Sequence, residues 1–248
     1  MAQTGRVDDG NGPVDDGAQA AIASRLPGAA ALGLVAPPMG DVVPALRLAD
    51  PDWTARVLTE RAAGARTTDR RVLATLWWYS ASSVLLTPAL AGLLTGRPLS
   101  ARLADTRLHL LPGAAPVAAS AAAGRAADLV QDLRGALTAV IGAVAEAGGT
   151  RPRPLWAIAT DSLANRLLAL GRAVGDVGAA TALAGPLAAA VGEPLPAPRY
   201  VDVAGTRFTR RASCCLIYRV PHEVVCTSCP RRDPAERQVL LEDAATRM

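Results

Sequence analysis

The chain has 248 residues, of which half are hydrophobic, and a net charge of +4. A chain of this length and composition can bury a sizeable core, as one large domain or two small ones. Aromatic residues make up only 3% of it, so the core must consist mainly of Leu, Val and Ala, which suit helices. We therefore expect a mainly α protein of the α+β class. The modest charge, without a basic run interleaved with aromatics, argues against a nucleic-acid binder.

Residues 1–16 are acidic and glycine-rich with almost no apolar side chains, which predicts a disordered leader. The leader contains neither the apolar stretch of a signal peptide nor a lipidation motif, so we expect a cytoplasmic protein. In that compartment, clustered cysteines are more often metal-binding or catalytic than disulfide-bonded. The rest of the chain divides into a mainly helical domain, 17–198, and a C-terminal segment, 199–248.

The first clear helix is expected over 51–63, with Asp50 as its N-cap and Pro51 in the first turn. Later in the chain, alternation predicts a short strand over 107–110. Its histidine, His109, has no second histidine or acid at ligand spacing, so we expect a structural role for it.

A second helix is expected to begin at Thr68 or Asp69 and to carry no charge from 72 to 96. Such a stretch is long enough to span a bilayer. However, it contains serines, threonines and Pro88, and arginines lie at both of its ends. We therefore favour a buried helix with a kink at Pro88, and peripheral membrane contact is the alternative.

Helical periodicity also predicts helices within 126–149, 153–175 and 176–192, the last broken near Pro186. A hairpin is expected around Ala204 and Gly205, followed by a final helix with Asp233 as N-cap. The fold prediction is thus a helical body with a few short strands and a small C-terminal cap.

All four cysteines lie in this cap, with the spacing C-C-x10-C-x2-C: Cys214, Cys215, Cys226 and Cys229. A disulfide between adjacent cysteines has poor geometry, because neighbouring Cα atoms are about 3.8 Å apart. A thioredoxin-like pair is disfavoured because its C-x-x-C opens a helix in a βαβ unit. Four thiolates also suit zinc, although zinc sites usually show two C-x-x-C pairs. A [2Fe-2S] cluster needs four thiolates in a wider frame, which uneven spacing can serve.

The C-C-x10-C-x2-C motif near the C-terminus, after an arginine-rich "RRAS" and with Tyr218 three residues beyond the second cysteine, resembles the FhuF-like family of ferric siderophore reductases. This resemblance implies that one [2Fe-2S] cluster is bound by the four cysteines: Cys214, Cys215, Cys226 and Cys229. It also implies a cytoplasmic oxidoreductase that passes one electron to the iron of a ferric siderophore, of hydroxamate type, and releases Fe2+.

A weaker similarity lies upstream, where Leu155 and Trp156 match the family and the next two residues depart from it. Arginines crowd the cysteine segment, where positive charge would favour the reduced cluster; they are Arg207, Arg210, Arg211, Arg219, Arg231 and Arg232. As residues that dock the substrate or the electron donor we name Arg210, Arg211, Arg219 and Trp156.

The sequence has no P-loop and no dinucleotide-binding glycine motif after a strand. Electrons are therefore expected from a separate ferredoxin or flavin reductase. Two further hypotheses stay open from the residues. One is a non-catalytic iron-sulfur protein, either an electron carrier or a sensor of iron or redox state. The other is a binding module stabilised by zinc.

Overall fold

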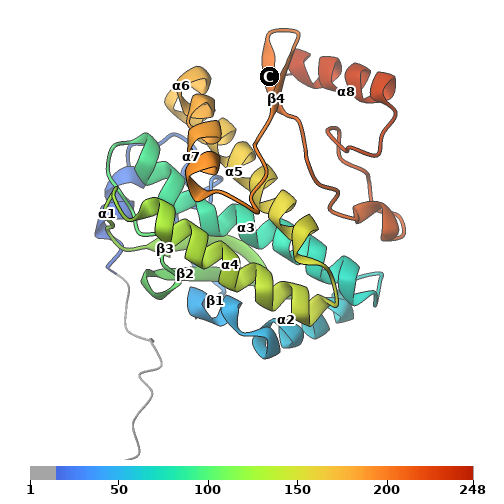
Figure 1. Cartoon of the computed structure of the whole chain (residues 1–248), viewed down its shortest axis with the longest axis horizontal. Coiled ribbons are helices and arrows are strands. Elements are labelled where there is room, and N and C mark those ends of the chain that lie inside the picture. The colour runs from blue at the N-terminus through green and yellow to red at the C-terminus, as the bar shows by residue number, and fades with distance from the viewer. Residues whose placement is uncertain (1–14, 248) are drawn as a thin grey trace, which may run out of the picture.

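A computed structural model describes residues 15–247 of the chain (Figure 1). Most of the predicted leader lies outside the described residues. The elements of the body are α1 (Gly17–Ala23), β1 (Asp41–Pro44), α2 (Pro51–Gly64), α3 (Arg70–Leu94), β2 (Thr106–Leu111), β3 (Ala115–Ala121), α4 (Leu129–Gly148), α5 (Pro152–Val174), α6 (Val177–Ala182) and α7 (Ala184–Val191). The cap contains β4 (Tyr200–Val203), β5 (Thr206–Thr209) and α8 (Pro234–Thr246). The mainly α prediction with a few short strands is confirmed.

Helix α3 is the centre of the body. It contacts α5, α4 and strand β3, and α4 also packs against α2 and α5 (Figure 1). Trp77 and Trp78 of α3 are fully buried, and the Trp78 indole donates a hydrogen bond to the Leu155 carbonyl on α5 at 2.9 Å. Burial of two large aromatic rings supplies much of the core's apolar contact. The two tryptophans therefore belong to the core of the body.

Several predicted helix boundaries are confirmed by their capping contacts. The carboxylates of Asp50, Asp69 and Asp233 each accept hydrogen bonds from backbone N–H groups in the first turn of α2, α3 and α8. Pro88 lies inside α3, which continues to Leu94. The expected break near Pro186 lies earlier, at Leu183, and Pro186 falls in the first turn of α7, where a proline costs little.

The strands of the body form an antiparallel sheet in the order β1-β2-β3. Strand β2 extends the predicted one by a residue at each end. His109 on β2 is buried, and its Nε2 lies 2.8 Å from the hydroxyl of Ser120 on β3, consistent with the structural role expected for it. Strand β3, which packs against α3, consists mostly of alanine.

No helix within residues 15–247 combines the length and the apolar character that a membrane crossing requires. The uncharged stretch of α3 is instead covered by neighbouring elements, since most of its side chains are buried. The preference for a buried helix over a membrane span is thereby supported.

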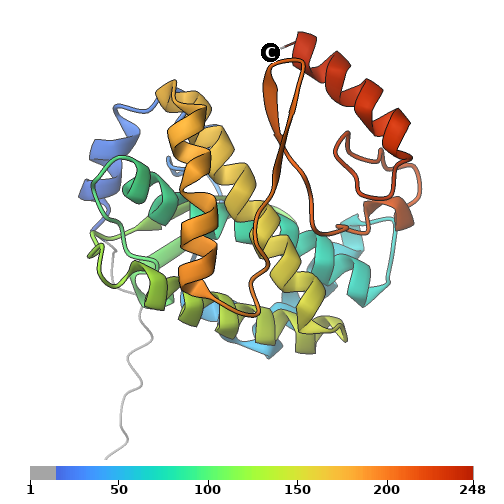
Figure 2. The same ribbon diagram turned by 45° about the horizontal axis from the view of Figure 1, so that its top comes forward.

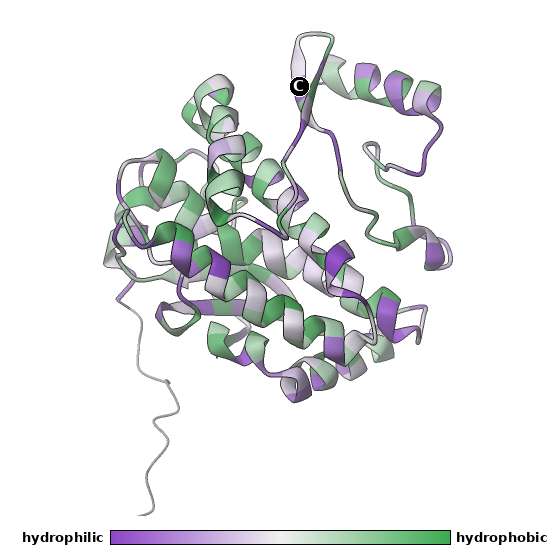
Figure 3. Cartoon of the chain, viewed as in Figure 1, coloured by the Kyte–Doolittle hydropathy of each residue, from purple (hydrophilic) through white to green (hydrophobic). Residues whose placement is uncertain are grey.

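The cap stands to one side of the body (Figure 2). The β4–β5 hairpin turns at Ala204 and Gly205, both with positive φ, as the sequence predicted. Its own core holds Val203 and Phe208 of the hairpin and Leu241 of α8. Figure 3 shows hydrophilic residues along much of α8, whereas the central helices are richer in hydrophobic ones. The cap therefore has little apolar material of its own.

Candidate metal centre

The cysteine segment connects β5 to α8 and lies beside α3 (Figure 2). It contains a short 3-10 turn, Ile217–Arg219, and two non-glycine residues with left-handed backbone, Leu216 at φ +64° and His222 at φ +65°. Left-handed conformations are uncommon for residues with a side chain and often accompany functional loops. Apart from this short turn, the backbone of the cysteine segment is irregular.

All four cysteines are free thiols in the structure. Cys215 and Cys229 are buried, whereas Cys214 and Cys226 are partly exposed. Among the described residues, no three side chains of the His, Cys, Asp or Glu type are already arranged to hold one metal ion. The thiols therefore share one segment and one surface without forming a closed single-ion site.

Arg211 is the side chain that links these sulfurs to the body. Its Nη1 donates toward Cys226 Sγ at 3.2 Å and lies 3.9 Å from Cys215 Sγ. The guanidinium also stacks over the Tyr79 ring of α3, 4.8 Å from the ring centroid. Its Nη2 is buried and has no hydrogen-bond partner among the described atoms. A buried guanidinium N–H without an acceptor leaves a place for one more acceptor.

Asp161 of α5 holds the start of the segment from the other side. One carboxylate oxygen accepts the Ala212 backbone N–H at 2.7 Å, and the other accepts the N–H and the hydroxyl of Ser213 at 3.0 and 2.5 Å. The second oxygen also faces Arg211 Nε at 3.4 Å, and each side chain of this ion pair is only 2% exposed. Because a buried charge is costly unless it is paired, Asp161 and Arg211 depend on each other.

Sequence reasoning missed Asp161, although a signal was present. The residue lies three positions after Ile158 and six after Leu155, two fully buried residues of α5. A carboxylate at that spacing on the apolar face of a helix is seldom left without a partner. The helical periodicity therefore indicates that Asp161 needs a buried cationic partner. It does not indicate that this partner is Arg211.

The thiols titrate in a partly apolar setting. Burial raises the pKa of Cys226, with Cys215 and Cys229 adding to the increase and Arg211 opposing it. Burial also raises the pKa of Cys214, while the Leu216 backbone N–H lowers it. These thiols are therefore protonated at neutral pH without a metal, and metal binding would release their protons.

Arg232, which lies just before α8, supports the C-x-x-C turn. Its Nε donates to the Cys226 carbonyl at 3.0 Å and its Nη2 to the Val225 carbonyl at 2.6 Å, while Glu236 pairs with Nη1. Hydrogen bonds from a charged guanidinium to carbonyl oxygens are stronger than those from neutral donors. The arginine thus fixes the backbone between Cys226 and the final helix.

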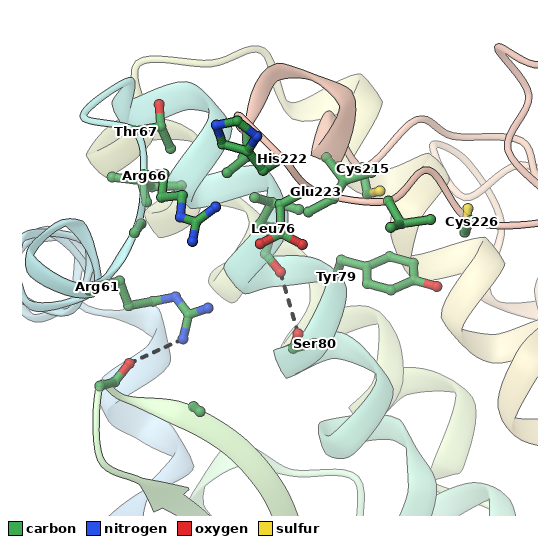
Figure 4. A pocket seen from close by; sticks show the side chains of 18 of the residues that line it. Arg61, Arg66, Thr67, Leu76, Tyr79, Ser80, Cys215, His222, Glu223 and Cys226 are labelled. Carbon is green, nitrogen blue, oxygen red and sulfur yellow. Dashed lines mark hydrogen bonds between the residues drawn. The ribbon is translucent and has the colours of Figure 1, made fainter.

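A cavity with a volume of about 810 Å³ adjoins the segment. Figure 4 shows Cys215 and Cys226 above the ring of Tyr79 at one end, Arg61 and Arg66 at the other, and His222 and Glu223 between them.

The residues named as docking candidates lie in different places. Arg211 is in the wall of this cavity. Arg210 is exposed and borders a separate, smaller pocket beside the β4–β5 hairpin and α8. Arg219 pairs with Asp69 at 3.6 Å. Trp156 is 5% exposed and packs in the core of the body, so it presents no surface to a docking partner.

The other arginines of the predicted cluster are also dispersed. Arg207 pairs with Asp202 on the hairpin at 2.8 Å, away from the sulfurs. Arg231 lies over the Tyr218 ring at 4.2 Å. Arg211 is thus the arginine whose contacts with cysteine sulfur the structure records.

Residues 211–231 match the family described as FhuF 2Fe-2S C-terminal domain. The matched stretch begins at Arg211 and contains all four cysteines. A comparison with curated proteins gives no match. The family match agrees with the resemblance that the cysteine spacing suggested, and it indicates a [2Fe-2S] cluster.

The residues present fit such a group in their donor chemistry. Four thiols suit the two irons of a [2Fe-2S] cluster. Nη1 of Arg211 faces two of the sulfurs, and Nη2 of the same guanidinium has no hydrogen-bond partner among the described atoms. Hydrogen bonds toward cluster sulfur are a common way in which proteins adjust such centres. Both observations are compatible with an iron-sulfur group, and the family match favours such a group over a single tetrahedral zinc ion.

Proposed function

We propose that the chain is a cytoplasmic ferric siderophore reductase whose [2Fe-2S] cluster is held by Cys214, Cys215, Cys226 and Cys229. The observation that carries this proposal is the FhuF 2Fe-2S match over 211–231, which spans all four cysteines in a segment at the protein surface. Partial exposure of Cys214 and Cys226 supports it, because a redox group at that place is close to a docked partner.

When bound, the cluster supplies a carrier for one electron at this surface. The residues around it provide position and charge. Asp161 holds the Ala212–Ser213 backbone against α5, and Arg211 directs its Nη1 toward the sulfurs of Cys226 and Cys215. One-electron reduction would add a negative charge to the cluster. The buried positive charge of Arg211 would therefore stabilise the reduced state of the cluster.

The substrate is Fe3+ in a siderophore, of the hydroxamate type. Its iron accepts one electron and becomes Fe2+, a weaker Lewis acid toward hard oxygen ligands, so the iron dissociates and the siderophore is left intact. The electron comes from a separate donor, a ferredoxin or a flavin reductase, because the sequence has no dinucleotide-binding motif. No proton donor or nucleophile is needed for this transfer.

A single-turnover reaction tests the proposal. The protein is reduced anaerobically, freed of reductant and mixed with a ferric trihydroxamate in the presence of a chromogenic Fe2+ chelator. We expect the visible absorption of the oxidised centre to return while about one Fe2+ is trapped per protein. A centre that stays reduced, with no Fe2+ formed, would refute the reductase and favour the electron carrier or sensor.

A further inference from the structure

The cavity beside the cysteine segment has walls from four parts of the chain. They are the end of α2 with the connection to α3, the exposed side of α3, the β2–β3 turn and the cysteine segment. We propose that this cavity is the docking site of the ferric chelate, and that it takes chelates of low net charge such as hydroxamates. This inference rests on the proposed function, since it names the place and the charge class of the same substrate.

The inner end of the cavity adjoins the redox residues. Cys215, Cys226 and Arg211 belong to its wall, and the Tyr79 ring forms the floor beneath the two sulfurs (Figure 4). A chelate in this cavity is therefore in contact with the residues proposed to hold the cluster. The smaller pocket beside the β4–β5 hairpin and α8 also has Arg211 in its wall, together with Ser228 of the C-x-x-C turn, but none of the cysteines.

The dimensions suit a whole chelate rather than a bare ion. Sites for small molecules usually measure about 300–1,000 Å³, and this one measures about 810 Å³. Its lining includes apolar side chains, among them Leu73 and Leu76 of α3 and Ile217 and Val220 of the segment. Apolar walls suit the hydrocarbon linkers that join the iron-binding groups of a siderophore.

Away from the sulfurs, the charges of the cavity wall are balanced. Arg61 and Arg66 belong to the wall, and so do Glu60 and Glu223. Arg61 is fixed by a 3.1 Å hydrogen bond to the Gly113 carbonyl on the β2–β3 turn. Arg211 is already engaged by Asp161 at the inner end, where metal-binding cysteines would add negative charge. A ferric tris-catecholate, with three negative charges, finds no excess of positive charge here, whereas a neutral or singly charged hydroxamate complex does not need one.

The experiment uses the Ga(III) complex of desferrioxamine, a linear trihydroxamate, because Ga(III) resembles Fe(III) in size and charge and is not reduced. Binding to the full chain is measured by titration calorimetry or by NMR. Two variants reduce the cavity, Gly64→Trp at its rim and Ser80→Trp on α3. The matched control is Gly135→Trp on α4, which lines none of the pockets described, and both glycines leave open space for a new side chain.

We expect Gly64→Trp and Ser80→Trp to weaken binding at least tenfold, and Gly135→Trp to bind as the parent chain does. Equal binding by all four proteins would overturn the inference. A parent chain that reduces the ferric trihydroxamate but does not bind its Ga(III) complex would also overturn it, and would leave the proposed function intact. If only the two cavity variants lose binding, and the parent chain does not reduce the ferric complex, the docking site is supported and the proposed reductase function is refuted.

The charge class is tested separately with the Ga(III) complex of a tris-catecholate at low salt. We expect it to bind at least tenfold more weakly than the trihydroxamate complex. Replacing Glu223 by Gln, which removes one negative charge from the cavity wall, should reduce the difference in affinity between the two complexes. Tighter binding of the tris-catecholate to the parent chain would contradict the charge argument.

Discussion

The body and the cap of this protein are held together in different ways. The body buries a continuous apolar core that includes Trp77, Trp78 and most of α3 and α5. The cap buries Val203, Phe208 and Leu241 in a small cluster, and polar contacts from Asp161, Arg211 and Arg232 hold its cysteine segment. The body can therefore reach its fold by apolar burial, whereas the segment depends on a few charged groups and on what it binds.

The largest effect is expected from the cysteines themselves. Cys215→Ser replaces a soft thiolate by a poor ligand for iron, so the visible absorption of the centre should be lost or strongly reduced, while far-UV circular dichroism shows the helices of the body unchanged. Ser228→Ala, which leaves all four thiols in place, is the control. An unchanged visible spectrum in Cys215→Ser would show that the proposed ligand set is wrong.

The next largest effect is expected at the contact between cap and body. Asp161→Ala leaves Arg211 buried without its anion and removes three acceptor contacts of the segment. Loss of one partner of a buried pair costs about 3–5 kcal/mol. We expect hydrogen exchange at the amides of Ala212 and Ser213 to become faster.

Asp128→Ala is the matched control for this change, because Asp128 is exposed and pairs with the exposed Arg125. It should alter stability by less than about 0.5 kcal/mol. Unaltered exchange at Ala212 and Ser213 in Asp161→Ala would mean that Asp161 does not hold the segment.

A substitution in the core of the body should lower the stability of the whole protein without changing the metal centre. Leu137 of α4 is 1% exposed and belongs to the main core. Leu137→Ala should lower the free energy of unfolding by about 2–5 kcal/mol, because it removes buried methyl groups and leaves a cavity. The visible spectrum of the folded protein should not change. A spectrum that shifts in Leu137→Ala would show that the centre is sensitive to the packing of the whole body.

The smallest effect is expected at Arg232, whose contacts are confined to the C-x-x-C turn and α8. Arg232→Ala removes hydrogen bonds to two partly buried carbonyls, which water can partly replace, so the two bonds together should contribute about 1–2 kcal/mol. The amides near Cys226 should exchange faster, and those of α5 should not. Arg102→Ala, which removes an exposed ion pair with Asp105, is the control and should cost at most about 1 kcal/mol.

The predictable part of this fold is the part that local chemistry encodes. The caps at Asp50, Asp69 and Asp233 and the turn at Ala204 and Gly205 follow from side-chain and backbone preferences of single residues. Strand β3 was not predicted, because a run of mostly alanine favours a helix. It becomes a strand through pairing with β2, and small side chains allow α3 to pack closely on it.

The candidate site divides in the same way. The family resemblance was readable from the cysteine spacing together with the preceding arginines and Tyr218, and the match over 211–231 supports that prediction. The contact between Asp161 and Arg211 joins residues far apart in the chain, and the cavity joins α2, α3, a hairpin turn and the segment. Neither is specified by a local pattern, because both arise from how the cap lies on the body.

The most direct test of the account is the iron and sulfide content of the anaerobically purified protein, measured together with its visible and EPR spectra. The account predicts about two irons and two sulfides per chain, a red-brown oxidised protein, and an EPR signal of one unpaired electron after one-electron reduction. A colourless protein that contains zinc and no sulfide would contradict it.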